Sequence, residues 1–549
     1  MKGLLATAEW SQRAVLEDVR PAAEPEMDEE IWKGTMKEVD KGWACGPWTA
    51  EQLTAKYGRG WVAARRFGLK QRSGVRMIDD FSAYRHNDCT TTHEKIDVGG
   101  VDEVAGLCKA WLQLKSGAQV SATLDDGAVM KGDLSEELDA GRGVALRGRS
   151  FDLEKAFKQI PVKKAHAQFA IFCVWNPRLK KPQFFEAKVM PFGVKASVPS
   201  FNRVGRALAV ILVSLFDIPC NHYFDDYPIV TCAEDSENAG EVAGLVFELL
   251  GWDVKTEGDK AAGFGEVLKT LGVEFRFRDA VKGEVGIVNR QDRVEEIAED
   301  IQGILASGIL KPAHAASLRG RLLFAQGQCF GRCGLASLRI LGRWAGAGGL
   351  GRPSWRRVEA ALRFWLAYFA AAAPRSLSCS DMNPVVIFTD GACEGVDRDI
   401  VTIGGVIYDA ATGGPECFGF QVPWDVVRSW RAEGKEQVIG QAEILPVYVA
   451  KYTWSKRVRN RRVLHFVDNE SAKFALVKGS SPQEDSAKIL DAFWEQEARL
   501  GTYSWFDRVR SESNPGDAPS RLDFEPMEAM GVRVVSARWD PVAVTSARW

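Results

Sequence analysis

Two kinds of hydrophobic spacing alternate along this chain. Residues 167–177 (AQFAIFCVWNP), 182–194 (PQFFEAKVMPFGV) and 269–277 (KTLGVEFRF) are short apolar or alternating runs bounded by turn residues, which predicts strands. Residues 197–216 (SVPSFNRVGRALAVILVSLF) and 290–307 carry apolar positions at helical spacing, which predicts long helices. At 549 residues the chain is too long for one hydrophobic core. The pattern therefore predicts a mixed α+β protein with several domains.

The most informative candidate functional residues lie in the segment 222–230 (HYFDDYPIV), where Asp225 and Asp226 interrupt an apolar run. We expect a β-hairpin bend here, and adjacent carboxylates suit Mg²⁺ because they repel each other without a cation. Taken alone, an Asp-Asp pair is more often a solvated turn. Upstream, Asp152 in RSFDLEKAF follows a strand-like run, and Lys70 and Arg76 flank a Ser-Gly turn, where they suit a polyphosphate.

A second series of acids occupies the C-terminal third. Asp390 ends the apolar run VVIFT, Glu443 lies in a helical segment that contains Pro446, and Asp468 ends the run RRVLHFV. Asp517 lies in a loop after a last strand. Each acid alone is typical of a protein surface. Only their order along the predicted succession of three strands, helix, strand, helix and strand indicates that the four acids share a function.

Taken in order, these segments resemble the polymerase motifs of reverse transcriptases, followed by ribonuclease H, in the style of LTR-type retrotransposons of the Ty3 or DIRS kind. The match runs from about residue 65 to 278 through VRMIDDF, FDLEKAF, MPFGVKASVPSF, YFDD, GDK and LGVEF. The resemblance implies a right-hand polymerase with fingers, palm and thumb or connection, then an RNase H-like α/β domain.

The resemblance also implies roles for individual residues. Two Mg²⁺ ions, or Mn²⁺ as the alternative, would be held at each site by the catalytic acids, which are Asp152, Asp225 and Asp226 in the first site and Asp390, Glu443, Asp468 and Asp517 in the second. Phe157 would exclude a ribose 2′-hydroxyl, and Lys260 would protonate the leaving pyrophosphate. The remaining substrate-binding residues would be Lys70, Arg76, Gly193 and Tyr223.

The same reading divides the chain into five parts. The predicted order is an N-terminal lead-in that is partly disordered, fingers and palm, a helical thumb or connection, an RNase H-like domain and a C-terminal tail, with the boundaries 1–60, 61–289, 290–378, 379–525 and 526–549. The helical part contains a run of arginines without intervening acids, at positions 319, 321, 332, 339 and 343. We expect this run to contact nucleic-acid phosphates.

Composition limits the compartment and the class of site. The formal net charge of −2 leaves no global basic field, so a nucleic-acid surface would be a local stripe. The 11 cysteines include no CxxC pair, which argues against zinc and for reduced thiols. We expect a cytoplasmic or nuclear protein without a signal peptide or membrane span.

The function predicted from the sequence is RNA-directed DNA synthesis with RNase H cleavage of the hybrid. The expected partners are an RNA template, a DNA primer, the RNA–DNA hybrid and dNTPs. An alternative is a decayed or co-opted retroelement protein that binds nucleic acid without catalysis, for which loss of a metal-binding acid is the expected sign. An RNA-dependent RNA polymerase would instead have a small residue in place of Phe157 and no second acid series.

Overall fold

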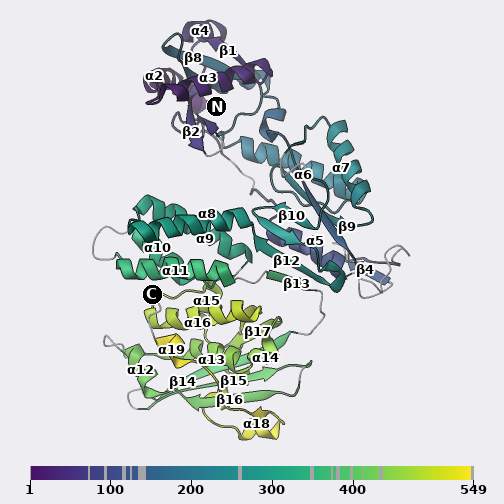
Figure 1. Ribbon diagram of the computed structural model, residues 1–549, viewed down its shortest axis with the longest axis vertical. Helices are drawn as coiled ribbons and strands as arrows, with labels where there is room; N and C mark the ends of the chain where they lie inside the picture. Colours follow the sequence, from purple (N-terminus) through teal and green to yellow (C-terminus); the bar gives the residue numbers. More distant parts are fainter. Residues whose placement is uncertain are drawn as a thin grey trace. The chain divides into compact units, whose positions relative to one another are not determined.

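The computed structural model divides into two compact units, Met1–Leu271 and Gly272–Trp549 (Figure 1). Each unit is described by itself. The structure describes residues 2–71, 74–91, 95–113, 119–123, 127–133, 144–257, 262–329, 331–346, 352–371, 375–378, 384–395, 400–411, 413–431 and 437–545.

The described part of unit 1 contains both helices and strands. Its helices are α1 (Lys2–Ala6), α2 (Ala8–Asp18), α3 (Pro25–Asp40), α4 (Ala50–Tyr57), α5 (Val101–Gln113), α6 (Ser197–Phe216) and α7 (Ser236–Leu249), with 3₁₀ turns η2 (Ala156–Gln159) and η3 (Lys164–Phe169). Its strands are β1 (Ala44–Trp48), β2 (Ala63–Gln71), β3 (Gly74–Asp80), β4 (Gln119–Thr123), β5 (Val129–Asp133), β6 (Leu146–Asp152), β7 (Ile171–Asn176), β8 (Lys181–Ala187), β9 (Asp226–Cys232) and β10 (Val267–Thr270).

A five-stranded sheet in the order β1-β8-β7-β2-β3 forms the first part of unit 1. The helices before β2 pack on this sheet, because α3 buries Ile31 and Trp32 against Phe172 and Phe185. Local signals in the sequence start these helices: Pro25 stands in the first turn of α3, and a capping box begins α4. We expected residues 1–60 to be a loosely packed lead-in. The structure instead makes them part of this core, since the apolar positions of α3 share one face.

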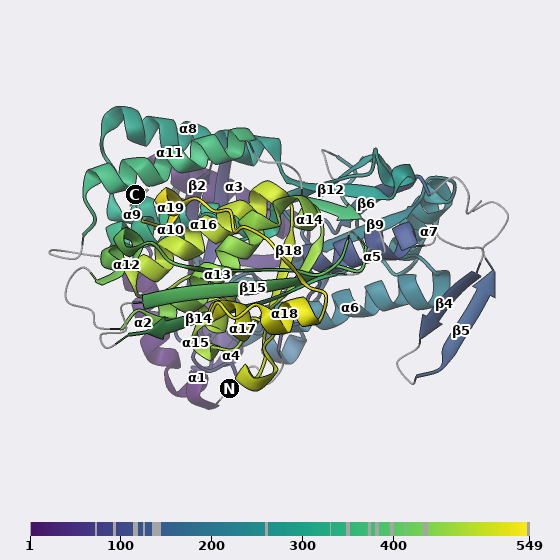
Figure 2. The same ribbon diagram turned by 90° about the horizontal axis from the view of Figure 1, so that it is seen from below.

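The second part of unit 1 is built on the antiparallel pair β6 and β9. Helices α6 and α7 cover this pair, with Phe151, Leu212 and Phe247 in the shared core. Helix α6 also has the length and apolar composition of a membrane span. Its residues Phe201 and Leu212 nevertheless belong to the buried core. The strands β4 and β5 form a separate two-stranded pair (Figure 2).

Unit 2 begins with short strands and four helices. These strands and turn are β11 (Val273–Arg276), η5 (Ala280–Lys282), β12 (Glu284–Asn289) and β13 (Arg375–Ser378). The helices are α8 (Gln291–Ser307), α9 (Pro312–Cys329), α10 (Leu335–Gly346) and α11 (Trp355–Ala371). They share a core that includes Ile301, Leu318, Leu341 and Trp365. This part matches the helical segment expected from the sequence.

The rest of unit 2 is a single sheet with flanking helices. Its strands are β14 (Val385–Glu394), β15 (Ile400–Tyr408), β16 (Glu416–Gln421), β17 (Arg462–Val467), β18 (Tyr503–Arg508) and β19 (Arg533–Val534). Its helical elements are α12 (Trp424–Arg431), α13 (Ile439–Thr453), α14 (Ser455–Val458), α15 (Glu470–Lys478), α16 (Glu484–Leu500), η6 (Ser511–Ser513), α17 (Asp517–Ser520), α18 (Glu525–Ala529) and α19 (Pro541–Thr545).

The strand order of this sheet is β18-β17-β14-β15-β16-β19. Strands β14, β15 and β16 are antiparallel neighbours, whereas β17 and β18 run parallel to β14. Helices α13 and α16 pack on one face of the sheet (Figure 1). Residues after 525, expected to be a tail, pair with β16 through β19 and bury Val544 in the same core. The predicted mixed α+β multidomain fold class is confirmed by these two units.

Candidate active sites

The β6–β9 pairing sets the first group of acids side by side. In the antiparallel register Asp152, the last residue of β6, lies opposite Asp226, the first residue of β9. Directly opposed residues in such a pair have Cα atoms about 4.5–5.5 Å apart. Asp225 occupies the two-residue turn before β9, which is closed by two hydrogen bonds of 2.9 Å between the main chains of Tyr223 and Asp226. The structure thus brings together all three acids that the sequence singled out here.

The environments of the three acids differ. Asp152 is buried and forms an ion pair with Lys255, whereas Asp225 and Asp226 are half-buried. The backbone N–H of Lys255 also donates to the Asp152 carbonyl oxygen at 2.9 Å. An ammonium group therefore compensates the charge of the most buried acid. Lys255 was not identified from the sequence, and Lys260, which we expected to protonate the leaving pyrophosphate, lies outside the described residues.

Phe157 lies near these acids in the chain, on the 3₁₀ turn η2 directly after β6. Its half-buried ring packs against Phe192 and Phe201, with centroid distances of 4.9 Å to each. We expected a helical turn here. The structure has a tighter one, because Lys155 adopts a left-handed conformation with φ of 50° before η2 begins. The ring still faces the segment that contains Gly193.

Gly193 has a structural reason to be glycine. Its φ is +88°, and a Cβ at this position would overlap the backbone carbonyl oxygen of Asp79 on β3. The Gly193 carbonyl in turn accepts a hydrogen bond of 2.9 Å from the side-chain amide of Asn87. Gly193 therefore lets the loop before α6 lie directly against β3.

The expected phosphate-binding residues lie on the β2–β3 hairpin. Arg76 is exposed on β3, and its register partner on β2 is Leu69. Lys70 is exposed and forms an ion pair of 3.3 Å with Glu24. Tyr223, beside the acidic turn, is 38% exposed and packs edge-on against Phe224. These three side chains are accessible to a substrate.

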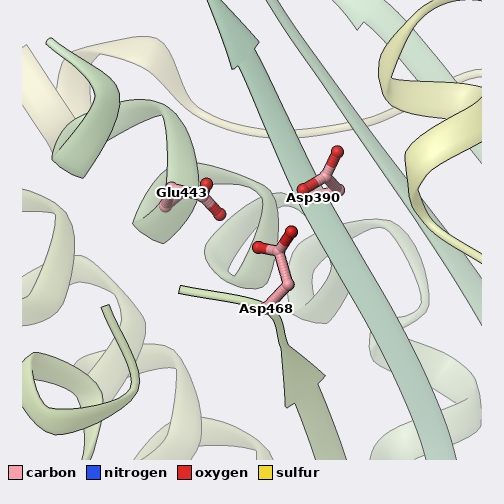
Figure 3. Close-up of side chains that lie close together, drawn as sticks. All are labelled: Asp390, Glu443 and Asp468. Carbon is pink, nitrogen blue, oxygen red and sulfur yellow. The ribbon is translucent and has the colours of Figure 1, made fainter. Parts of the chain in front are cut away.

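The second group of acids lies in unit 2 and forms a tight cluster. Carboxylate oxygens of Asp390, Glu443 and Asp468 all lie within 4.8 Å of one another. They come from strand β14, helix α13 and the residue after β17, and their side chains point toward a common centre (Figure 3). Asp390 is not at the end of its strand as expected, because β14 continues to Glu394 along β15. It does follow the last β14–β17 pair, Phe388–Phe466, so it faces Asp468.

Burial and mutual repulsion hold protons on this cluster. Burial, with the charges of Asp468 and Asp390, raises the pKa of Glu443 to about 9. Burial also raises the pKa of Asp390 to about 6, although a hydrogen bond of 2.6 Å from the Ser520 hydroxyl opposes this shift. The charges of Asp468 and Asp517 add to the effect on Asp390. The cluster therefore favours a positive partner.

Gly391 explains how Glu443 comes so near to Asp390. A Cβ at Gly391 would overlap the carbonyl oxygen of Ala442, so the backbones of α13 and β14 are in direct contact there. Pro446 lies in the interior of α13. Because proline has no N–H, it cannot donate to the carbonyl of Ala442 one turn earlier. That carbonyl is thus free to approach the strand.

Asp517 stands beside the cluster and outside the group that lies within 4.8 Å. It begins α17 and forms an ion pair of 3.1 Å with Arg521. Helix α17 lies against the sheet at Gly404 and Gly419, where a Cβ would overlap the backbone of α17. This contact brings the Ser520 hydroxyl to Asp390, and no motif in the sequence predicts that hydrogen bond.

The donor set of this cluster fits a divalent cation. It offers only carboxylate oxygens, the ligands that Mg²⁺ prefers. In the described part of the chain no lysine or arginine pairs with Asp390, Glu443 or Asp468. The atoms Glu443 Oε2 and Asp468 Oδ1 are buried and receive no hydrogen bond from any described residue. A cation between the acids would compensate their negative charge and provide a partner for these two oxygens.

The arginine run of unit 2 is used largely within the unit. Arg321 pairs with Asp300 on α8, Arg339 pairs with Asp491 on α16 at 3.4 Å, and Arg332 lies over the Trp494 ring at 5.8 Å. Arg319 and Arg343 are exposed. The expected phosphate contact therefore remains a prediction for those two side chains, because the other three hold helices together.

Three contributors to the sites escaped the sequence analysis: Lys255, Gly391 and Ser520. A glycine directly after an acid in a strand-like run was a usable signal for Gly391, since such a glycine indicates close backbone approach. Lys255 and Ser520 reach their acids only through long-range packing. No local sequence pattern predicts these two contacts.

Two of the solved structures that this chain matches are of foamy viral proteins. They are the structure of the foamy viral protease-reverse transcriptase in complex with dsDNA and that of the foamy viral protease-reverse transcriptase dRH in complex with ds DNA. Each is 13% identical in sequence, covers 89% of this chain and has a TM-score of 0.45, and the match spans 84% and 72% of the respective neighbour. No protein-family model and no curated protein sequence matches the chain. We therefore infer function from the carboxylates themselves.

Proposed function

We propose that this chain is an RNA-directed DNA polymerase with ribonuclease H activity from an LTR-type retroelement. The observation that carries the proposal is the presence of two separate carboxylate groups, one in each unit. Asp152 lies opposite Asp226 on neighbouring strands, and Asp390, Glu443 and Asp468 converge within 4.8 Å. Phosphoryl transfer depends on positioning and on electrostatic stabilisation, which such groups provide.

Both sites would work with divalent cations. When bound, a pair of Mg²⁺ ions would activate the attacking oxygen and neutralise charge on the leaving oxygen. In unit 1, Asp152, Asp225 and Asp226 would hold the ions, while exposed Arg76 and Lys70 would bind the β- and γ-phosphates through charge-assisted hydrogen bonds.

Phe157 supports deoxyribonucleotides as the substrate class. Its aromatic ring is fixed between two other phenylalanines, directly after the strand that carries Asp152. A rigid ring at this place would leave no room for a ribose 2′-hydroxyl. Tyr223 and Gly193 would line the neighbouring surfaces for primer and incoming nucleotide.

In unit 2, Asp390, Glu443, Asp468 and Asp517 would direct a water molecule against the RNA strand of a hybrid. The raised pKa values of Asp390 and Glu443 mean that cation binding must displace protons from this cluster. Coupling the two activities is chemically economical, because the first produces the hybrid that the second cleaves.

Primer extension tests the polymerase assignment. The full chain should incorporate dTTP on poly-rA/oligo-dT with Mg²⁺ or Mn²⁺, and Asp225→Asn should remove this activity. Equal incorporation by the wild type and by Asp225→Asn would refute the assignment.

Cleavage of a labelled RNA–DNA hybrid tests the second assignment. Asp468→Asn should abolish hybrid cutting and leave extension intact, because Asp468 lies in unit 2 and the polymerase acids lie in unit 1. A decayed or co-opted protein would bind the hybrid without either activity. The presence of all seven acids favours the enzyme.

A further inference from the structure

Four buried charges form a continuous chain through the first part of unit 1. Arg66 on β2 makes two hydrogen bonds to the Asp79 carboxylate, at 2.6 and 3.0 Å, and a third of 2.8 Å to Glu38 Oε2. The other Glu38 oxygen, Oε1, lies 3.1 Å from Lys158 Nζ. All four residues are less than 9% exposed.

Glu38 is the middle of this chain because its two oxygens serve different partners. It belongs to helix α3, whereas Arg66 and Asp79 belong to the five-stranded sheet and Lys158 to the turn η2. Burial alone would lower the pKa of Arg66, but the charges of Asp79 and Glu38 raise it above its ordinary value. The Arg66 guanidinium also lies 3.7 Å from the Phe172 ring, so its orientation is fixed.

Both ends of this series of buried charges, Asp79 and Lys158, lie next to residues of the proposed nucleotide site. Lys158 directly follows Phe157 on a turn of four residues. Asp79 lies on β3 with Arg76, and its carbonyl oxygen is the atom against which Gly193 packs. The substrate-binding residues Phe157, Arg76 and Gly193 are thus linked through the buried carboxylate of Glu38 on helix α3.

A second contact ties the same helix to the same turn. The Glu38 carbonyl accepts a hydrogen bond of 2.9 Å from the Trp43 backbone N–H just beyond α3. The Lys155 ammonium, immediately before η2, lies 5.0 Å from the Trp43 ring centroid. The end of α3 therefore holds η2 on both sides of Phe157.

We propose that Glu38 is a positioning residue for the nucleotide site, and this inference rests on the polymerase function proposed above. Its carboxylate fixes the turn that carries Phe157 relative to the strand that carries Arg76. It thereby sets the selection of deoxyribonucleotides over ribonucleotides. Loss of its charge leaves Lys158 facing a neutral group in a buried place, whereas Arg66 keeps the Asp79 carboxylate, so the turn must move to rehydrate Lys158.

The test compares single-nucleotide incorporation of dTTP and rUTP by the full chain. In Glu38→Gln the ratio of kcat/KM for dTTP to that for rUTP should fall at least about fivefold, with the KM for dTTP raised more than kcat is lowered. Because the ratio is taken on one preparation, it does not depend on the fraction of folded enzyme. Glu30→Gln is the matched control, since Glu30 is exposed on the same helix.

Three further variants make the outcome decisive. Glu38→Asp keeps the charge but cannot reach both partners, so its ratio should fall between those of wild type and Glu38→Gln. Lys158→Met should reproduce the loss of selection, and combining it with Glu38→Gln should add little. Phe157→Val gives the ratio expected when the ring itself is removed.

Two results would count against these expectations in different ways. If Glu38→Gln and Lys158→Met only lower Tm and leave the dTTP/rUTP ratio unchanged, Glu38 is a structural residue and the inference is overturned. If the wild-type chain extends no primer, the proposed function itself fails and the inference fails with it.

Discussion

Glu443 and Asp390 hold protons at pH values where ordinary carboxylates are ionised. Their pKa values in the folded chain are about 9 and about 6, above the ordinary values of 4.5 and 3.8. The folded state therefore binds more protons than the unfolded state between about pH 4 and about pH 9. Stability from these groups is fully present below about pH 4 and is lost as pH rises through the folded pKa values.

We predict that, in the presence of a chelator, Tm falls as the pH rises from about 5 to about 9. In Glu443→Gln the fall above about pH 6 should be smaller, because this variant has no proton to lose at that position. Added Mg²⁺ should offset the fall in the wild type, since ionised carboxylates bind it better. Thermal unfolding followed by circular dichroism measures this, and identical slopes in both proteins would contradict it.

Individual residues show which part of a site the sequence can reveal. Asp152 and Asp468 were predictable because each follows a strand-like run, so their local context already places them at a strand end. The ion pair of Lys255 with Asp152 was not predictable, because their contact depends on the packing of the chain after α7.

At the scale of elements, the contact between α13 and β14 controls the second site. We predict that Gly391→Ala destabilises unit 2 by about 1–3 kcal/mol, because its Cβ would overlap the Ala442 carbonyl. Hybrid cleavage should be lost while primer extension continues. Denaturant unfolding and the two activity assays check this.

Gly440→Ala is the control for that change. Gly440 is on the same helix, and a Cβ there meets nothing within 4 Å. This variant should keep both activities and be at least as stable as the wild type. Equal effects of the two substitutions would show that backbone contact at Gly391 does not matter.

The contact between α13 and α16 contains a fully buried ion pair. Lys451 has no exposed side-chain surface and pairs with Glu497, which also accepts hydrogen bonds of 2.7 Å from the Thr502 hydroxyl and the Ser504 backbone N–H. We predict that Lys451→Met costs about 3–5 kcal/mol, because it leaves Glu497 buried without a cation.

A double variant separates the pair from simple packing loss. Adding Glu497→Gln to Lys451→Met should recover part of the lost free energy of unfolding, since no uncompensated charge then remains. Urea unfolding of the single and double variants measures the difference. Strictly additive losses would refute the prediction.

Several elements were predictable and others were not. The strands β7 and β8 and the helix α6 follow directly from hydrophobic periodicity, as does the order of β14 to β18. Residues 1–60 were read as a lead-in because of the acidic stretch PAAEPEMDEE at residues 21–30, and residues 526–549 were read as a tail because no motif was recognised in them. Their helices form because α3 and α19 find buried partners far along the chain, which periodicity does not report.

At the scale of the whole molecule, the two carboxylate groups belong to two separate units. We predict that Mg²⁺ slows amide hydrogen exchange around residues 225 and 468 independently. Asp468→Asn should remove the effect in unit 2 and leave that around residue 225 unchanged. Hydrogen exchange with mass spectrometry measures both regions in one sample, and loss of both effects together would argue for coupled metal binding.

The absence of a Cβ at Gly391 limits how the cluster of Asp390, Glu443 and Asp468 can change in evolution. Because two main chains touch there, the spacing of the acids is inherited with the backbone and not with any one side chain. A change of Glu443 to Asp would alter the reach of one side chain only, whereas a Cβ at position 391 would displace the backbone of α13 itself. Tolerance to mutation should therefore be as low at Gly391, which carries no functional group, as at the acids themselves.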